Sequence, residues 1–176
     1  MDFARNLEDL KGFLEARRYR WALIGGVALA VYGRARTTLD LDLAVEIDAQ
    51  EELVRYMEES GFETLHCSAA YSNHLHPDPM RGRIDFLYVR GSTRDQLFAE
   101  AQTRPGPRGI IVRVPRPEHL IAMKVQAMKS DPGRTFQDLA DIRHLILLPG
   151  VDHDEIRSHF ERQGLLDRYR ELERSL

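Results

Sequence analysis

The segment 21–46 constrains the fold of this chain more than any other stretch of its sequence. It opens on a short apolar run that predicts a buried strand, and Gly25 and Gly26 end this run. The uniformly apolar stretch 27–32 that follows predicts a short buried helix. Residues 38–46 then alternate between apolar and polar side chains, which is the period of a strand with one buried face. Strand, glycine turn, helix and strand in this order predict a core that combines helices with a sheet.

Hydrophobic periodicity along the rest of the chain extends this interpretation. Further helices are expected over 3–18, 48–60, 117–129 and 135–148, with one or two more from residue 154 to the end. Further strands are expected over 62–66, 84–89 and 109–114, with a loop over 67–82. Strands alternate with helices in the first two thirds of the chain and helices dominate afterwards, which predicts an α/β or α+β fold with a helical C-terminal extension. We therefore expect a core over 1–116 and a helical region over 117–176 packed on that core.

The composition is that of an ordinary globular protein, with 43% hydrophobic and 30% charged residues in a chain of 176. The single cysteine, Cys67, excludes an internal disulfide bond and suits a reducing cytoplasm. The longest apolar stretch, 21–32, contains two glycines and is too short to span a bilayer, and the N-terminus lacks a signal-peptide core. We therefore expect a cytoplasmic protein with no membrane partner.

Charge is unevenly distributed along the chain, whose formal net charge is −3. The segment 81–116 contains eight arginines against Asp85, Asp95 and Glu100, which gives a local charge of +5. Such a segment is typical of a surface that faces a polyanion, but eight solvated loop arginines would give the same pattern. The sequence leaves both interpretations open.

Three aspartates on two expected strands form the candidate metal site. Asp40 and Asp42 occupy alternate positions of one strand, so their side chains project from the same face. Two carboxylates roughly 5–7 Å apart repel each other unless a cation lies between them, although a solvated acidic strand face is the alternative for this pair alone. Asp85 lies within the apolar strand 84–89, where a charge is costly unless it meets a cation. Mg²⁺ suits such a site because it binds a few carboxylates and completes its shell with water and phosphate oxygens.

Gly25 and Gly26 favour the functional interpretation of these acids. Glycine allows the backbone to approach a ligand closely, and the amides at a helix N-terminus bind phosphate oxygens. The segment matches neither the dinucleotide-binding fingerprint nor the P-loop. Three strand carboxylates beside a phosphate-binding turn indicate two-metal phosphoryl-type transfer.

This pattern, Gly25-Gly26 followed by R-x-T-x-D-x-D over 36–42, resembles the first motif of the DNA polymerase beta-type nucleotidyltransferase superfamily. The likeness is close over 20–47 and looser over 84–89 and 117–148. Many members have Gly-Ser where this chain has two glycines, which removes one hydroxyl and leaves the amides. The resemblance implies the nucleotidyltransferase fold, a small mixed twisted sheet flanked by helices, with the catalytic core over 1–116.

The resemblance also implies roles for individual residues. Asp40, Asp42 and Asp85 are expected to be catalytic and to bind two Mg²⁺ ions, which Mn²⁺ can replace. A nucleoside triphosphate such as ATP is expected to supply the transferred nucleotide, held by the glycine turn. Arg36 and Thr38 are expected to support the phosphate or the metal ligands, and a simple ion pair with a neighbouring acid is the alternative for the arginine.

Lys124 is expected to face inward on the helix that begins at Pro117. At 100° per residue it falls near the centre of the apolar stripe, so it needs an anionic partner or must extend along its neighbours to water. The segment 134–145 resembles the R-x-x-x-D-x-x-D-L helix of the abortive-infection toxins of type IV toxin–antitoxin systems. In that branch an inward lysine and an aspartate of the next helix complete the nucleotide site. This implies Lys124 and Asp138, with Asp141 as a weaker candidate and surface exposure as the alternative for both aspartates.

Histidine and cysteine residues are concentrated between residues 66 and 76. The ligand types are His66, Cys67, His74 and His76, but their spacing matches no familiar zinc site. A loop that borders the active site is the favoured interpretation.

The acceptor hydroxyl remains open at this point. RNA, in particular tRNA, fits the toxin branch and the basic segment 81–116, and that branch implies an antitoxin protein as a partner. A small hydroxylated molecule is the alternative, because lincosamide and aminoglycoside nucleotidyltransferases share similar motifs. A non-catalytic, partner-binding or antitoxin-like module is a third interpretation, against which all three carboxylates and the lysine are present.

Overall fold

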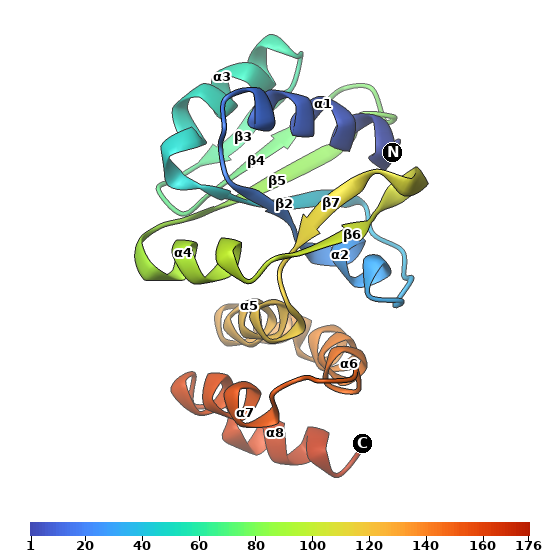
Figure 1. Ribbon diagram of the computed structural model, residues 1–176, viewed down its shortest axis with the longest axis vertical. Coiled ribbons are helices and arrows are strands. Elements are labelled where there is room, and N and C mark those ends of the chain that lie inside the picture. The colour runs from blue at the N-terminus through green and yellow to red at the C-terminus, as the bar shows by residue number, and fades with distance from the viewer. The chain divides into compact units, whose positions relative to one another are not determined.

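A five-stranded mixed sheet organises the first part of the chain in the computed structural model, which describes all 176 residues (Figure 1). The strand order is β1-β2-β5-β4-β3. In this order the strands are Trp21–Leu23, Asp40–Glu46, Arg83–Val89, Tyr71–Leu75 and Glu63–Cys67. β2 and β5 are parallel, and the other neighbouring strands are antiparallel. The mixed α/β fold class predicted from the sequence is confirmed.

Helices cover both faces of this sheet. Figure 1 shows α1 and α3 along one face, and α2 and α4 on the other side. These helices are Phe3–Ala16, Gln50–Glu59, Gly25–Val31 and Gly91–Ala99. Two further strands, β6 (Gln102–Pro105) and β7 (Ile111–Val114), form a separate antiparallel pair. The chain divides into two compact units, and these elements all belong to the first, Met1–Pro115.

The core of the first unit lies between the sheet and the α1–α3 layer. Leu41 and Leu43 of β2 are fully buried, as are Ile84 and Phe86 of the adjacent strand β5. The helices contribute the buried side chains Leu7, Leu10, Leu14, Leu53 and Met57. Burial of each such side chain stabilises the fold by about 1.5–3 kcal/mol. The opposite face of β2 and β5 carries polar residues where these strands begin, namely Asp40, Asp42, Arg83 and Asp85.

The strands β4 and β6 and the helix α4 were not predicted from the sequence. The expected loop 67–82 contains β4, whose inward positions carry Ser72 and His74 in place of apolar residues, so the hydrophobic alternation is hidden. The helix α4 buries Leu97 and Phe98, which are adjacent in sequence and form no apolar stripe at helical spacing. In both cases packing against the rest of the unit overrides a weak local signal.

The first residues of the 38–46 strand were also assigned wrongly. Leu39 was expected on the buried face, but it precedes β2 and is 81% exposed. The short helix begins at Gly25 and not at residue 27, so both glycines belong to its first turn.

The second unit, Arg116–Leu176, is entirely helical. Its helices α5 to α8 are Pro117–Ser130, Thr135–Ile146, His153–Arg162 and Leu166–Glu173. α5 packs against α6 and α7, and α8 packs against α7. Its core includes Leu120, Ile121, Val125, Met128, Ile142, Leu145, Ile146, Ile156, Phe160, Tyr169 and Leu172. None of the helices in the chain combines the length and apolar character that crossing a membrane requires.

A buried polar network replaces apolar packing under β4. Ser72 Oγ lies 2.8 Å from His74 Nε2 and 2.7 Å from the Tyr88 hydroxyl, while Thr64 Oγ1 lies 3.2 Å from His74 Nδ1. Burial lowers the pKa of His74 below its ordinary value of 6.5. Burial also raises the pKa of Tyr88 to about 12. Both groups are therefore neutral near pH 7, and every polar atom of the imidazole has a partner.

This network predicts that the folded protein loses stability in mild acid. Because the folded pKa of His74 lies below 6.5, the unfolded chain takes up the proton more readily, so stability is fully present above pH 6.5 and falls below it. At pH 5.5 the loss from this group is at most about 1.4 kcal/mol. Urea unfolding at pH 7.5, 6.5 and 5.5 measures it. The His74→Asn variant should lack this component of the pH dependence, and equal slopes for both proteins would contradict the assignment.

Candidate active site

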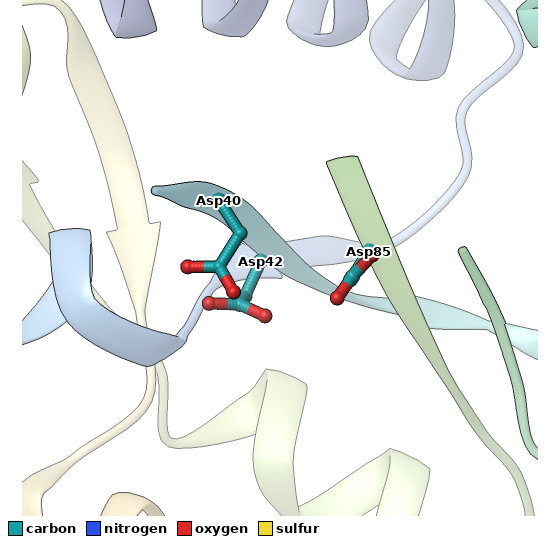
Figure 2. A group of neighbouring side chains, drawn as sticks. All are labelled: Asp40, Asp42 and Asp85. Atoms are coloured by element: carbon teal, nitrogen blue, oxygen red, sulfur yellow. The ribbon is translucent and has the colours of Figure 1, made fainter. Parts of the chain in front are cut away.

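Three aspartates from β2 and β5 converge on the polar side of the sheet. Parallel pairing places Asp42 directly opposite Asp85, and Asp40 lies two residues earlier on the same face. One carboxylate oxygen from each of the three residues lies within 4.8 Å of the others. Figure 2 shows the three carboxyl groups on one side of the strands, with Asp85 contributed by the neighbouring strand. All three residues were predicted as one site from the sequence, and the structure brings them together.

The proximity of these carboxylates is electrostatically unfavourable without cations. At 4.8 Å and an effective dielectric constant of about 20, each pair of full charges repels by about 3 kcal/mol. All three side chains are half-buried, so water screens them only in part. Oxygen ligands at this spacing are the donor set that Mg²⁺ and Mn²⁺ prefer, so the residues fit a divalent-cation site.

The glycine turn lies directly against this cluster. A Cβ atom at Gly25 would overlap the Asp42 carboxylate and come within 2.8 Å of Asp42 Cβ, and the φ angle of Gly25 is +63°. A Cβ atom at Gly26 would come within 2.6 Å of Thr38 Oγ1. The amide of Ile24 donates to the carbonyl oxygen of Asp42 at 3.0 Å. Both glycines are therefore required sterically for β2 to approach the turn.

Thr38 and Arg36 have different surroundings. Thr38 Oγ1 donates to Asp40 Oδ1 at 2.7 Å, which orients that carboxylate. Arg36 is half-buried and donates through Nη1 to the carbonyl oxygen of Thr37 at 3.2 Å. The expected support of a metal ligand by Thr38 thus has a matching contact, and the phosphate role of Arg36 stays a prediction.

Arg83 belongs to this site and was not predicted from the sequence. Its Nε donates to both carboxylate oxygens of Asp85, at 2.9 and 3.1 Å. The hydrogen bond to Asp85 raises the pKa of Arg83, and the charges of Asp85, Asp40 and Asp42 add to this effect. The signal was available, because an arginine two residues before an acid on a strand shares its face. The expected strand began at residue 84 and left it out.

Lys124 forms a second charged cluster, within the helical unit. Its Nζ donates to Asp138 Oδ1 at 2.9 Å and to Asp141 Oδ2 at 2.7 Å. Asp138 is 1% exposed and Asp141 is fully buried, so the alternative that these aspartates are surface residues is wrong. Asp141, ranked below Asp138 from the sequence, is equally engaged with the lysine. The nucleotide-binding role of the three residues stays a prediction.

The Lys124 cluster predicts a large loss of stability when its only lysine is removed. The Lys124→Met variant removes the ammonium group that both buried carboxylates contact, and Arg134 lies 3.6 Å from Asp138. Breaking a buried ion pair in this way costs about 3–5 kcal/mol. Urea unfolding followed by circular dichroism measures the loss, with the exposed Lys129→Met on the same helix as control. Equal stability of the two variants would contradict a structural role for this cluster.

Comparison with known proteins supports the fold and not a sequence family. No family model and no curated protein matches the sequence. Among solved structures, the antibiotic-resistance factor ANT(2'')-Ia has 18% identity and a TM-score of 0.67, covering 99% of this chain and 98% of its own. The lincosamide adenylyltransferase LnuA, solved with lincomycin bound, has 15% identity and a TM-score of 0.55, covering 81% and 96%.

A third similar structure is a nucleotidyltransferase-like protein from Paracoccidioides brasiliensis. It has 18% identity and a TM-score of 0.56, and the match covers 93% of this chain and 88% of that chain. All of these neighbours are nucleotidyltransferases or resemble them, and two are matched along nearly their whole length. The chain has the nucleotidyltransferase fold that its glycine turn and Asp-x-Asp pair predicted.

Proposed function

We propose that this protein is a metal-dependent nucleotidyltransferase that transfers a nucleoside monophosphate from a nucleoside triphosphate to an acceptor hydroxyl. One observation carries the proposal: Asp40, Asp42 and Asp85 place carboxylate oxygens within 4.8 Å of one another in this fold. A fold alone hosts many activities, so the function must be argued from the site.

The three aspartates would hold two Mg²⁺ ions, or Mn²⁺ in their place. Bound there, these ions would neutralise the triphosphate and lower the pKa of the attacking hydroxyl. Asp40 is fixed for this task by Thr38, and Asp42 by the strand pairing and the adjacent glycine turn. Divalent cations bound there would also offset the repulsion between the three closely spaced carboxylates.

The residues of the chain then have distinct tasks in the reaction. Asp85 orients the acceptor hydroxyl and accepts its proton, while the backbone at Gly25 and Gly26 approaches the phosphates closely. The hydroxyl oxygen forms a new bond to the α-phosphorus as the bond from that phosphorus to the bridging oxygen breaks, and pyrophosphate leaves. Positioning and charge neutralisation supply most of the rate enhancement in such transfers. Lys124 and Asp138 are assigned to the triphosphate, and Arg36 to its phosphates, by resemblance to the family.

A small hydroxylated molecule is the acceptor that we favour. ANT(2'')-Ia has been solved with adenylyl-2''-tobramycin, with 16% identity and a TM-score of 0.64 to this chain, and LnuA with lincomycin. Both are matched over at least 96% of their length, so nearly all of each of these chains has a counterpart in this one.

The arginines of the segment 81–116 give the second reason. Each has a partner within the protein, either an acidic side chain or an amide or carbonyl oxygen. The partners, in order from Arg81 to Arg116, are Asp9, Asp85, Ala69, Asp48 with Asp95, Gln102, Asp2, Phe98 and Glu155. Because each arginine already has a partner within the protein, the segment offers less unpaired basic charge to a polyanion than its sequence suggests, and Arg108 is the most exposed of those in ion pairs, at 73%. An RNA acceptor with an antitoxin partner, supported by the likeness of the segment 134–145 to the toxin branch, is the second candidate.

Removal of single carboxylates tests the proposed chemistry. The variants Asp40→Asn and Asp42→Asn should lose transfer by at least roughly 100-fold, the scale of losing one preorganised electrostatic group. Their folded state should be as stable as the wild type or more so, because repulsion within the cluster falls. Pyrophosphate release and urea unfolding measure the two effects, with Asp167→Asn, an exposed acid of α8, as control. Full activity in both variants would refute the metal site.

The acceptor class is tested by the mass of the product. The protein is incubated with Mg²⁺ and each nucleoside triphosphate in turn, together with tobramycin, lincomycin or bulk tRNA. We expect a nucleotide to be added to a small molecule, at a rate that depends weakly on salt for lincomycin. Labelling of tRNA that requires Asp42 and falls steeply with salt would instead establish the RNA candidate.

A further inference from the structure

We propose that Arg83 is a positioning residue. Its guanidinium pairs with Asp85 as an internal cation, is displaced from Asp85 by a divalent ion, and then binds the triphosphate. The proposal rests on the function argued above, because it assigns a new role within the same site. It makes Arg83 a determinant of both metal and nucleotide affinity.

The strand register places Arg83 at the corner of the carboxylate cluster. It lies directly opposite Asp40 on β2 and two residues before Asp85 on β5, so all three side chains share the polar face of the sheet. The hydrogen bonds from Nε to Asp85 and the register opposite Asp40 place the guanidinium against two members of the cluster. The guanidinium of Arg83 therefore borders the carboxylate cluster on its Asp40 and Asp85 side.

The contact between Arg83 and Asp85 occupies the acid that a metal would need. A single nitrogen, Nε, spans both oxygens of Asp85 at 2.9 and 3.1 Å. A divalent cation that binds Asp85 must therefore share or displace this hydrogen bond. The Arg83 side chain is 46% exposed, so water can solvate it as it moves. A partly exposed pair of this kind is weak and readily exchanged.

The displaced guanidinium keeps donors for the incoming anion. Nη1 and Nη2 of Arg83 make no hydrogen bond in the structure, because the contact with Asp85 uses Nε alone. A guanidinium presents these donors in a planar fork that matches two phosphate oxygens.

The two halves of the proposal are measured separately on the full-length protein. Mn²⁺ binding without nucleotide is followed by electron paramagnetic resonance, and binding of ATP with Mg²⁺ by calorimetry. In the Arg83→Gln variant we expect Mn²⁺ to bind roughly two- to five-fold more tightly, because its competitor is gone. ATP should bind roughly ten-fold more weakly, because a charged hydrogen-bond donor is lost. In Arg83→Lys, ATP should bind more weakly than in the wild type, because lysine lacks the fork.

Matched variants separate this role from a general change of charge. Arg55→Gln removes the same charge from an exposed ion pair with Glu51 on α3 and should leave both affinities unchanged. Urea unfolding of Arg83→Gln checks that the fold is intact. Unchanged or weaker Mn²⁺ binding, or unchanged ATP binding, in folded Arg83→Gln would overturn the proposal.

The failure of the proposed function gives a different result. If wild-type protein binds no Mn²⁺, or binds it equally well as Asp42→Asn, the metal site itself is refuted and the role of Arg83 falls with it. If Mn²⁺ binding depends on Asp42 but not on Arg83, the nucleotidyltransferase proposal stands and only the competition is wrong.

Discussion

The parallel pairing of β2 with β5 is the constraint on which the rest of this structure depends. It sets Asp42 beside Asp85 on the polar face while Leu41 and Leu43 enter the core with Ile84 and Phe86. A register shift of one residue would send Asp85 into the apolar layer and Phe86 to the surface. The hydrophobic core therefore fixes the geometry of the acids, and the free energy of burial opposes their mutual repulsion.

The two units treat buried charge in opposite ways. In the helical unit Lys124 lies between two aspartates, and its ammonium group offsets much of their charge. In the sheet unit three carboxylates lie within 4.8 Å of one another, and Arg83 pairs with Asp85. Three converging carboxylates are a place where an external cation gains free energy, whereas a cluster built around a buried lysine mainly holds helices together. This difference is why the metal proposal rests on the sheet unit alone.

Local pattern was sufficient for part of this site and insufficient for the rest. The alternation along 38–46 predicted the face shared by Asp40 and Asp42, and the apolar flanks of Asp85 marked it as unusual. Strand order, which decides that β5 lies next to β2, is a tertiary property that no periodicity contains. β4 was not predicted because Ser72 and His74 satisfy each other's hydrogen-bonding needs inside the core. Its polar residues therefore gave no hydrophobic signal of a buried strand. Arg83 was missed by one residue at a strand boundary, where sequence signals are weakest.

The steric fit between Gly25 and Asp42 limits how this protein can change over evolutionary time. Any side chain at residue 25 would strain the backbone and displace the Asp42 carboxylate. Gly25 and Asp42 must therefore be inherited together. The β3–β4 end of the sheet offers more freedom, since Leu65, Tyr71 and Leu75 are exposed there and have room to vary. In such a lineage, substitutions accumulate at the β3–β4 end of the sheet, while the glycine turn beside Asp42 stays unchanged.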